Sequence, residues 1–146
     1  MEVEDAAGPA PIGLWRLFGC VVYDGLVLLA LWMAGTALLL PFTGGEAVRP
    51  DQPLYPAYLI AIAIAYLGWF WTHGGQTLGM RAWRCRLVSL SSPAVDWTQA
   101  LTRFLGAGVS WLALGAGFAW LLVDPDRRTW HDRLSGTAIV DASAVD

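Results

Sequence analysis

The chain has 146 residues, of which 56% are hydrophobic and 14% charged, and its formal net charge is −3. A soluble domain carries about 25% charged residues, so this composition is typical of a membrane protein rather than a soluble enzyme. The small negative charge excludes the global basic field expected of a nucleic-acid-binding protein. We predict one membrane domain over residues 1–146, with its core at about 14–140 and short flexible ends.

Two apolar runs are long enough to cross a bilayer as helices. The first, Leu14 to Leu40, is interrupted by Arg16 and Asp24 and would be about 40 Å long as a helix. Residues 41–53 are rich in Gly and Pro and predict a turn. The second run, Leu54 to His73, has about the 20 residues that match the hydrocarbon core. We therefore predict an all-α membrane protein with two full transmembrane helices.

Two short stretches have the pattern of β-strands. They are Arg84 to Leu90, which follows the second span, and Thr137 to Asp141 near the C-terminus. Each is too short to be stable alone, so we predict that they pair in a small ladder on the cytoplasmic face. Between them, Asp96 is suited to be the N-cap of the next helix.

The third apolar run, Phe104 to Val123, permits two topologies. If it crosses fully, with Arg103 in the loop before it, the arginines divide five against four between the two sides, which is unusual under the positive-inside rule. If it turns back as a hairpin or re-entrant segment at Leu114–Gly117, the division is eight against one, with Arg49 alone on the far side. We favour the hairpin, which places both termini in the cytoplasm.

Two further patterns bear on that choice. The hairpin would bring six tryptophans to one interface as an aromatic belt, namely Trp15, Trp69, Trp71, Trp97, Trp120 and Trp130. A single packed span is favoured instead by a stripe of small and polar residues on one helix face, made of Gln99, Arg103, Gly106, Ser110, Ala113 and Gly117.

Asp24 is the most informative residue of the first run. It lies eight residues beyond Arg16, about 12 Å along a helix, so it is near the membrane midplane if Arg16 is at the interface. A carboxylate there costs on the order of 3 kcal/mol, and such groups face protein or a wet cavity rather than lipid. Two roles remain open for Asp24: a cation or proton site, or a buried polar residue that fixes helix packing.

The C-terminal tail carries a compact titratable cluster, His131-Asp132-Arg133. An imidazole beside a carboxylate could move protons near neutral pH, and Asp132 is also a candidate partner for Arg16. No nucleophile, metal-ligand spacing or cofactor loop accompanies the cluster, and Cys20 and Cys85 match no metal motif. We therefore predict no catalytic residue, no metal, no cofactor and no enzymatic activity.

The chain resembles the RDD family of bacterial membrane proteins. That family is named after an Arg at the start of the first helix, an Asp within that helix and a later Asp, which match Arg16, Asp24 and Asp132 here. The stretch Gly75 to Arg81 looks like the family's G-Q-T-x-G-K-R block, and residues 128–137 look like its terminal H-D-R-x-x-G-T block.

Two positions depart from the family pattern: Met80 replaces the usual basic residue, and Arg84 stands where a Gly is frequent. The resemblance implies a bacterial cytoplasmic (inner) membrane protein of poorly defined function that is suspected of transport. Some members are thought to exchange cations for protons, which would suit a membrane-embedded Asp24.

The sequence therefore supports two kinds of function. The first is transport of ions or small solutes, and the second is a non-transporting membrane scaffold or assembly subunit. Three apolar runs hardly enclose a pathway, so besides the bilayer we expect a homo-oligomer or another membrane protein as partner, and no nucleic acid. The residues expected to bind a ligand or ion, or to pair structurally, are Arg16, Asp24, Gln76, Arg81, His131, Asp132 and Arg133.

Overall fold

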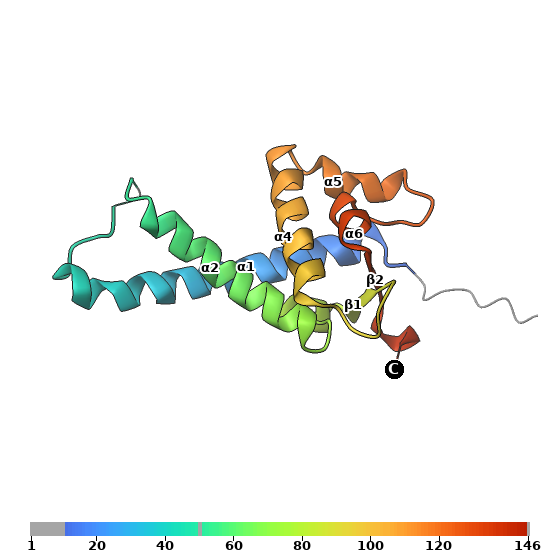
Figure 1. Cartoon of the computed structure of the whole chain (residues 1–146), viewed down its shortest axis with the longest axis horizontal. Helices are drawn as coiled ribbons and strands as arrows, with labels where there is room; N and C mark the ends of the chain where they lie inside the picture. The colour runs from blue at the N-terminus through green and yellow to red at the C-terminus, as the bar shows by residue number, and fades with distance from the viewer. Residues whose placement is uncertain (1–10, 50, 146) are drawn as a thin grey trace, which may run out of the picture.

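A long helical hairpin forms one part of the molecule, and all other elements gather at one of its ends (Figure 1). The structure is a computed structural model that describes residues 11–49 and 51–145. The hairpin consists of α1 (Leu14–Leu39) and α2 (Leu54–Thr72), and both are long and apolar enough to cross a membrane. The two predicted spans are thus confirmed, whereas the prediction of flexible ends concerns mainly residues 1–10 and 146, which lie outside the described residues.

The tip of the hairpin is a turn that begins with a short 3-10 helix, η1 (Leu40–Thr43). Below the tip, α1 and α2 approach closely because Gly35 has no side chain: a Cβ there would lie 2.7 Å from Ile62. Polar side chains also join the two helices. The Trp32 indole donates to the Leu59 carbonyl at 2.9 Å, and the Tyr58 hydroxyl donates to the Gly35 carbonyl at 3.1 Å. Polar groups inside a bilayer need such internal partners.

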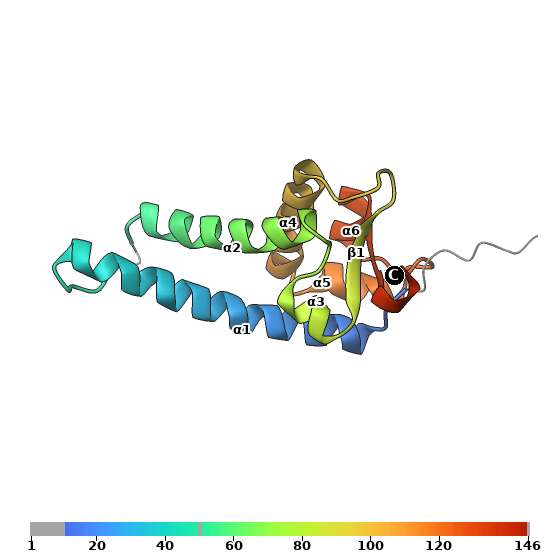
Figure 2. The same ribbon diagram turned by 90° about the horizontal axis from the view of Figure 1, so that it is seen from below.

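At the other end of the hairpin, the chain forms a small antiparallel sheet. After the short helix α3 (Leu78–Ala82), strand β1 (Cys85–Ser89) pairs with β2 (Thr137–Asp141). The ladder confirms the predicted pairing of these two stretches. Figure 2 shows α3 and β1 beside the start of α1. A further bridge joins Pro11 to Val140, and the short helix η3 (Ala142–Ala144) follows β2, so both described ends of the chain lie at this end of the hairpin.

The third apolar run is bent and does not form one straight span. Helix α4 (Trp97–Leu112) runs across the hairpin, as Figure 1 shows, and α5 (Ala116–Ala119) with η2 (Trp120–Leu122) follows at an angle of 106°. The bend occurs where Leu114 and Gly115 have φ of 54° and 79°. This is the segment expected to turn the chain, and Gly adopts such angles without steric cost. As expected, Asp96 is the N-cap of α4, in a capping box with Gln99.

The small and polar stripe on α4 is buried, and its central residues, Arg103 and Gly106, face the C-terminal helix α6 (Trp130–Ser135). The ends of the stripe have other neighbours: Gln99 donates to Ser89, and Ser110 lies against Gly117 of α5. Gly106 permits the close approach, since a Cβ at this position would lie 2.9 Å from the His131 Cβ. The stripe and the turn therefore both exist, and the two sequence patterns do not exclude each other.

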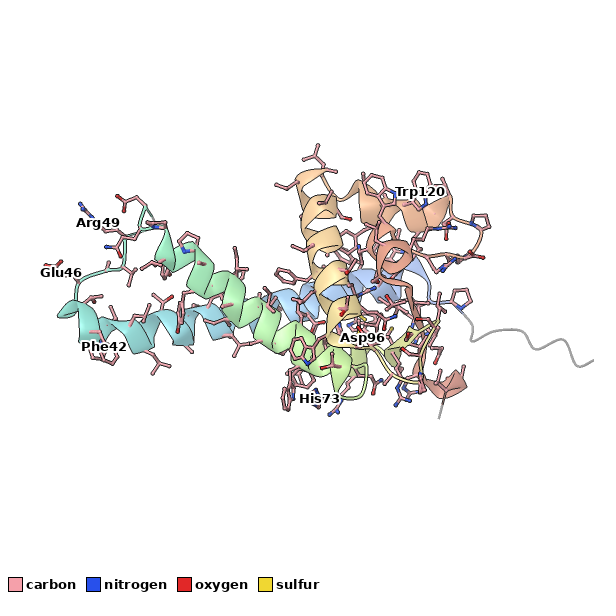
Figure 3. The ribbon with its side chains drawn as sticks, in the orientation of Figure 1. Phe42, Glu46, Arg49, His73, Asp96 and Trp120 are labelled. Atoms are coloured by element: carbon pink, nitrogen blue, oxygen red, sulfur yellow. The ribbon has the colours of Figure 1, made fainter. Side chains whose placement is uncertain are left out.

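The two ends of the hairpin differ in charge and in aromatic content. Phe42, Glu46 and Arg49 lie at the tip, whereas His73, Asp96 and Trp120 lie at the opposite end (Figure 3). The elements that carry the other eight arginines all adjoin that opposite end. The belt of six tryptophans stays a prediction, and Trp71 does not fit it, because only 6% of its surface is exposed.

Candidate functional site

Asp24 is buried in α1, as its cost in a bilayer predicted, and it accepts three hydrogen bonds. The Tyr66 hydroxyl of α2 donates to Oδ1 at 2.9 Å, and the Gly79 N–H donates to the same oxygen at 2.9 Å. The Thr77 hydroxyl donates to Oδ2 at 2.5 Å. All three partners are donors, so the carboxylate joins α1 to α2 and to the loop that follows α2. Its depth in the bilayer stays a prediction.

The Gly75–Gly79 block provides the loop that covers Asp24. Gly75 has a φ of +70°, and a Cβ there would lie only 2.3 Å from the Leu87 carbonyl oxygen, so a side chain does not fit at this position. The Gln76 side chain donates to the Cys85 carbonyl at 2.8 Å. Thr77 also accepts from the Met80 N–H at 3.2 Å and so begins α3.

Gly79 must lack a side chain for the same reason: a Cβ would lie 2.6 Å from the Cys20 carbonyl oxygen and 2.9 Å from the Asp24 carboxyl carbon. Gly75, Gln76, Thr77 and Gly79 therefore each make a close contact with α1 or β1. Arg81, at the end of α3, is exposed and makes no side-chain hydrogen bond or ion pair within the described residues.

Arg16 pairs with Asp141, so the expected pairing with Asp132 is wrong. Its Nη1 lies 2.5 Å from Asp141 Oδ2 at the end of β2, and its Nη2 donates to the carbonyls of Trp83 and Arg84 at 2.8 and 2.6 Å. The hydrogen bond from Arg16 holds the pKa of the Asp141 carboxyl below its usual range. Arg16 thereby joins the start of α1 to the residues just before β1 and to the end of β2.

Asp132 pairs instead with Arg103 of α4, and both side chains are almost fully buried, at 2% and 3% exposed. Asp132 Oδ2 also accepts from the Thr129 N–H at 2.9 Å and from the Thr129 hydroxyl at 2.5 Å, which forms the capping box of α6. Burial disfavours the charged carboxylate, yet Arg103 and Thr129 together hold the pKa of Asp132 below its ordinary value. One carboxylate thus both begins α6 and fixes it to α4.

His131 and Arg133, the other two residues of the tail cluster, differ in burial. His131 is 3% exposed and its ring meets Phe118 edge-on, with 4.8 Å between ring centroids. Burial and the positive charge of Arg103 lower the pKa of His131 to about 3. Arg133 faces outward and pairs with Asp124 and, at 3.5 Å, with Asp126. A proton carrier near neutral pH needs a pKa near that value, so His131 does not fit this role here.

A cavity of about 300 Å³ lies between the spanning helices and the bent segment. Its wall is mostly apolar and comes from α1, α2, α4, α5, α6 and neighbouring residues. Asp24, Arg103 and His131 line it, together with the thiol of Cys20. Among the described residues no group of three or more His, Cys, Asp or Glu could hold a metal ion. A mostly apolar cavity with a few polar side chains is a common feature of small-molecule sites in proteins in general.

Sequence reasoning missed several residues of this site. Arg103 was treated as a loop charge, and Trp71 as part of an interfacial belt, but both line the cavity. Tyr66 and Asp141 carried no signal in the sequence, because their roles depend on which segments meet in space. Arg103 could have been found from its place on the small and polar stripe of α4.

The chain has two apolar spans and a bent third segment, and a buried ion pair joins elements of its polar end. These features define a multi-pass membrane protein. The RDD family model matches residues 11–136, and the chain belongs to the RDD family. It is similar to the uncharacterized protein YckC of Bacillus subtilis (strain 168), with 24% identity over 143 residues, which cover 91% of this chain and 86% of YckC. No solved structure matches the chain.

We predict that Asp24→Asn destabilises the protein even though it preserves size. The amide replaces one acceptor oxygen by an NH2 group, so at least one of the three donors loses its acceptor. A buried unsatisfied group costs about 1–3 kcal/mol, which should lower the melting temperature in detergent. Asp51→Asn, on the exposed turn at the tip, is the matched control. Equal melting temperatures for both variants would show that the three hydrogen bonds do not hold the fold.

We also predict a pH dependence caused by His131. The unfolded side chain binds a proton near its ordinary pKa of 6.5, whereas the folded one stays neutral until about pH 3. Between these values the unfolded state binds more protons, so stability falls as pH falls, by about 1.4 kcal/mol per pH unit. The measurement is the free energy of unfolding from pH 7 to pH 4.5. His131→Gln should flatten the slope, and an unchanged slope would assign the effect to another group.

Proposed function

We propose that this protein is a transport protein of the membrane, or the membrane subunit of one, and that it binds small solutes in the cavity beside Asp24. The proposal is supported mainly by the position of the cavity. Both spanning helices and the bent third segment contribute to its wall, and that wall contains Asp24 and Arg103. Charged residues within membrane segments are expensive and mark substrate or ion pathways by default.

The geometry favours an uncharged solute over a cation. Exchange of cations for protons is the version that family resemblance suggests, with Asp24 as the ion site. Both oxygens of Asp24 already accept hydrogen bonds from protein donors. Hard cations bind several oxygen ligands at once, and the described residues offer no cluster of acidic side chains around Asp24. Asp24 therefore acts in this proposal as a structural residue at the edge of the cavity.

The second candidate function is a non-transporting scaffold or assembly subunit. It is favoured by the finding that Arg16, Asp24 and Asp132 all have partners within the chain. These residues could then be required only for folding. In either function we propose assembly as a homo-oligomer or with another membrane protein, since two spans and one bent segment do not surround a pathway. The proposal contains no catalytic step.

We further propose that the protein lies in the bacterial inner membrane with both termini in the cytoplasm. Eight of nine arginines belong to segments at the end of the hairpin that carries the described termini, and Arg49 alone is at the tip. Ala144→Cys should therefore resist a membrane-impermeant thiol reagent added to intact cells, and Glu46→Cys at the tip should react. Both positions are exposed, whereas the native Cys20 and Cys85 are buried. Reaction of Ala144→Cys without reaction of Glu46→Cys would show the opposite orientation, with the tip of the hairpin in the cytoplasm.

The transport proposal predicts flux in vesicles that contain the purified protein. Labelled glycerol and labelled sodium are the two probes, and a pH-sensitive dye inside the vesicles reports proton movement. We expect glycerol to enter faster than into empty vesicles and sodium to enter at the rate of empty vesicles, because three protein donors already engage the Asp24 carboxylate. Gly25→Leu should abolish the glycerol flux by filling the cavity, since Gly25 lines it and a Cβ there meets nothing within 4 Å.

Gly108→Leu is the matched control for that experiment. Gly108 is an exposed helical glycine with equally open space around its Cβ, and it does not line the cavity. Folded Gly108→Leu protein should keep the flux of the unchanged protein. If neither probe crosses faster than in empty vesicles, transport through this cavity is contradicted and the scaffold function stands. If sodium flux appears and Asp24→Asn removes it, the cation version is correct.

A further inference from the structure

A tight turn with two exposed arginines follows α3, beside the start of α1 (Figure 2). The turn begins at Arg81 and ends at Arg84, and the Arg84 N–H donates to the Arg81 carbonyl at 3.2 Å. A turn of this kind keeps its first and last Cα atoms within about 7 Å of each other. Both side chains are exposed, and neither makes a hydrogen bond or an ion pair with a described residue. The turn therefore carries two positive charges that no described residue neutralises.

Contacts with α1 place this turn at one end of the first span. The Arg16 guanidinium donates to the Trp83 carbonyl at 2.8 Å and to the Arg84 carbonyl at 2.6 Å. Arg16 is the third residue of α1, which begins at Leu14. The Trp83 ring covers Gly19, where a Cβ would lie 2.1 Å from the ring. The turn thus lies beside the first two turns of a spanning helix, where the apolar span meets the polar end of the molecule.

Exposed aromatic side chains are present at the same end of α1. Trp15 and Phe18 of α1 are exposed and meet edge-on, and the Trp83 ring on the neighbouring turn is also exposed. Tryptophan is enriched at the level of the lipid headgroups, where its ring is partly apolar and partly in contact with water. The phosphates of the lipids occupy that layer, and anionic lipids attract basic side chains near the membrane surface.

Arg84 also has a backbone conformation that is strained for an arginine. Its φ is 52°, in the left-handed region, which a glycine adopts without steric cost. The Arg84 carbonyl accepts from Arg16 and, at 2.9 Å, from the Ala142 N–H, and a glycine would offer the same carbonyl. Strained residues of this kind cluster at functional sites. The backbone gives no reason for an arginine here, so we look for the reason in its charged side chain.

We propose that this turn binds the phosphate of an anionic phospholipid, with Arg81 and Arg84 contacting the phosphate and Trp83 lying beside the headgroup. The ligand is a lipid rather than a soluble phosphate because exposed apolar side chains of a spanning helix adjoin the two charges. The inference goes beyond the proposed function, since none of these three residues lines the cavity beside Asp24. Lipid binding and solute flux can therefore fail separately.

The test measures which lipids stay bound to the full chain. The protein is placed in nanodiscs of equal parts phosphatidylglycerol, which is anionic, and phosphatidylcholine, which is not. Native mass spectrometry after release into mild detergent then counts the retained lipids. We expect phosphatidylglycerol to be retained in preference to phosphatidylcholine. Arg81→Gln and Arg84→Gln should each lower this preference about fivefold, the contribution of one arginine near an anionic surface.

Arg127→Gln is the matched control. Arg127 is also exposed, has a φ of 50° and makes no ion pair with a described residue, but it belongs to the loop between η2 and α6. Its variant should keep the full preference for phosphatidylglycerol.

Two variants of Arg84 separate the charge of its side chain from folding. Arg84→Gly should lower the lipid preference as Arg84→Gln does. Its melting temperature in detergent should stay equal or rise, because glycine relieves the left-handed conformation. Arg84→Lys keeps the charge and should keep most of the preference.

Four results would overturn the inference. An unchanged preference in both Arg81→Gln and Arg84→Gln would show that the turn does not bind the lipid. An equal loss in Arg127→Gln would assign the preference to the general charge of this end of the molecule. Displacement of the lipid by glycerophosphoglycerol, the soluble headgroup without acyl chains, would make this a site for free phosphates. A lower melting temperature of Arg84→Gly with an unchanged preference would give Arg84 a structural role alone.

Discussion

The carboxylate of Asp24 is the contact on which the polar half of the molecule depends. It accepts hydrogen bonds from a tyrosine on the neighbouring span and from the loop that follows that span, so it fixes the loop against α1. The loop continues into α3 and β1, and β1 positions β2 in the ladder. Arg16 then joins the start of α1 to the far end of β2. A single charged group in an apolar helix thereby determines where a sheet forms some distance from it in the sequence.

The three residues that name the family have structural roles in this chain. Arg16 holds the strands to α1, Asp24 holds the loop, and Asp132 begins α6 and neutralises Arg103. Each is satisfied within the chain, as buried charges require. The buried nitrogens without a partner among the described residues belong to other side chains, such as those of Trp71 and His131. Arg103 belongs to both groups, because it pairs with Asp132 while its Nε has no partner among the described residues.

The spans, the ladder, the Asp96 cap and the burial of Asp24 could be predicted because each depends on local physics. Length and hydropathy determine a span, alternation determines a strand, and the cost of a charge in lipid turns Asp24 inward. The partners of the charges could not be predicted in the same way. Arg16 meets Asp141 because the register pairs Cys85 with Asp141, next to the Trp83 and Arg84 carbonyls. Asp132 was already occupied by Arg103, which had been assigned to a loop.

The ion pair between Arg103 and Asp132 also constrains the order in which the chain is made. The two residues are 29 positions apart, so at about 5–20 residues per second Arg103 leaves the ribosome seconds before its partner exists. An unpaired guanidinium costs about 2.5–3.5 kcal/mol at the centre of a bilayer. Burial of Arg103 before Asp132 exists would leave its charge without this partner, which disfavours docking of α4 in its final place. Stable docking of the third segment therefore depends on a residue that is synthesised only near the end of the chain.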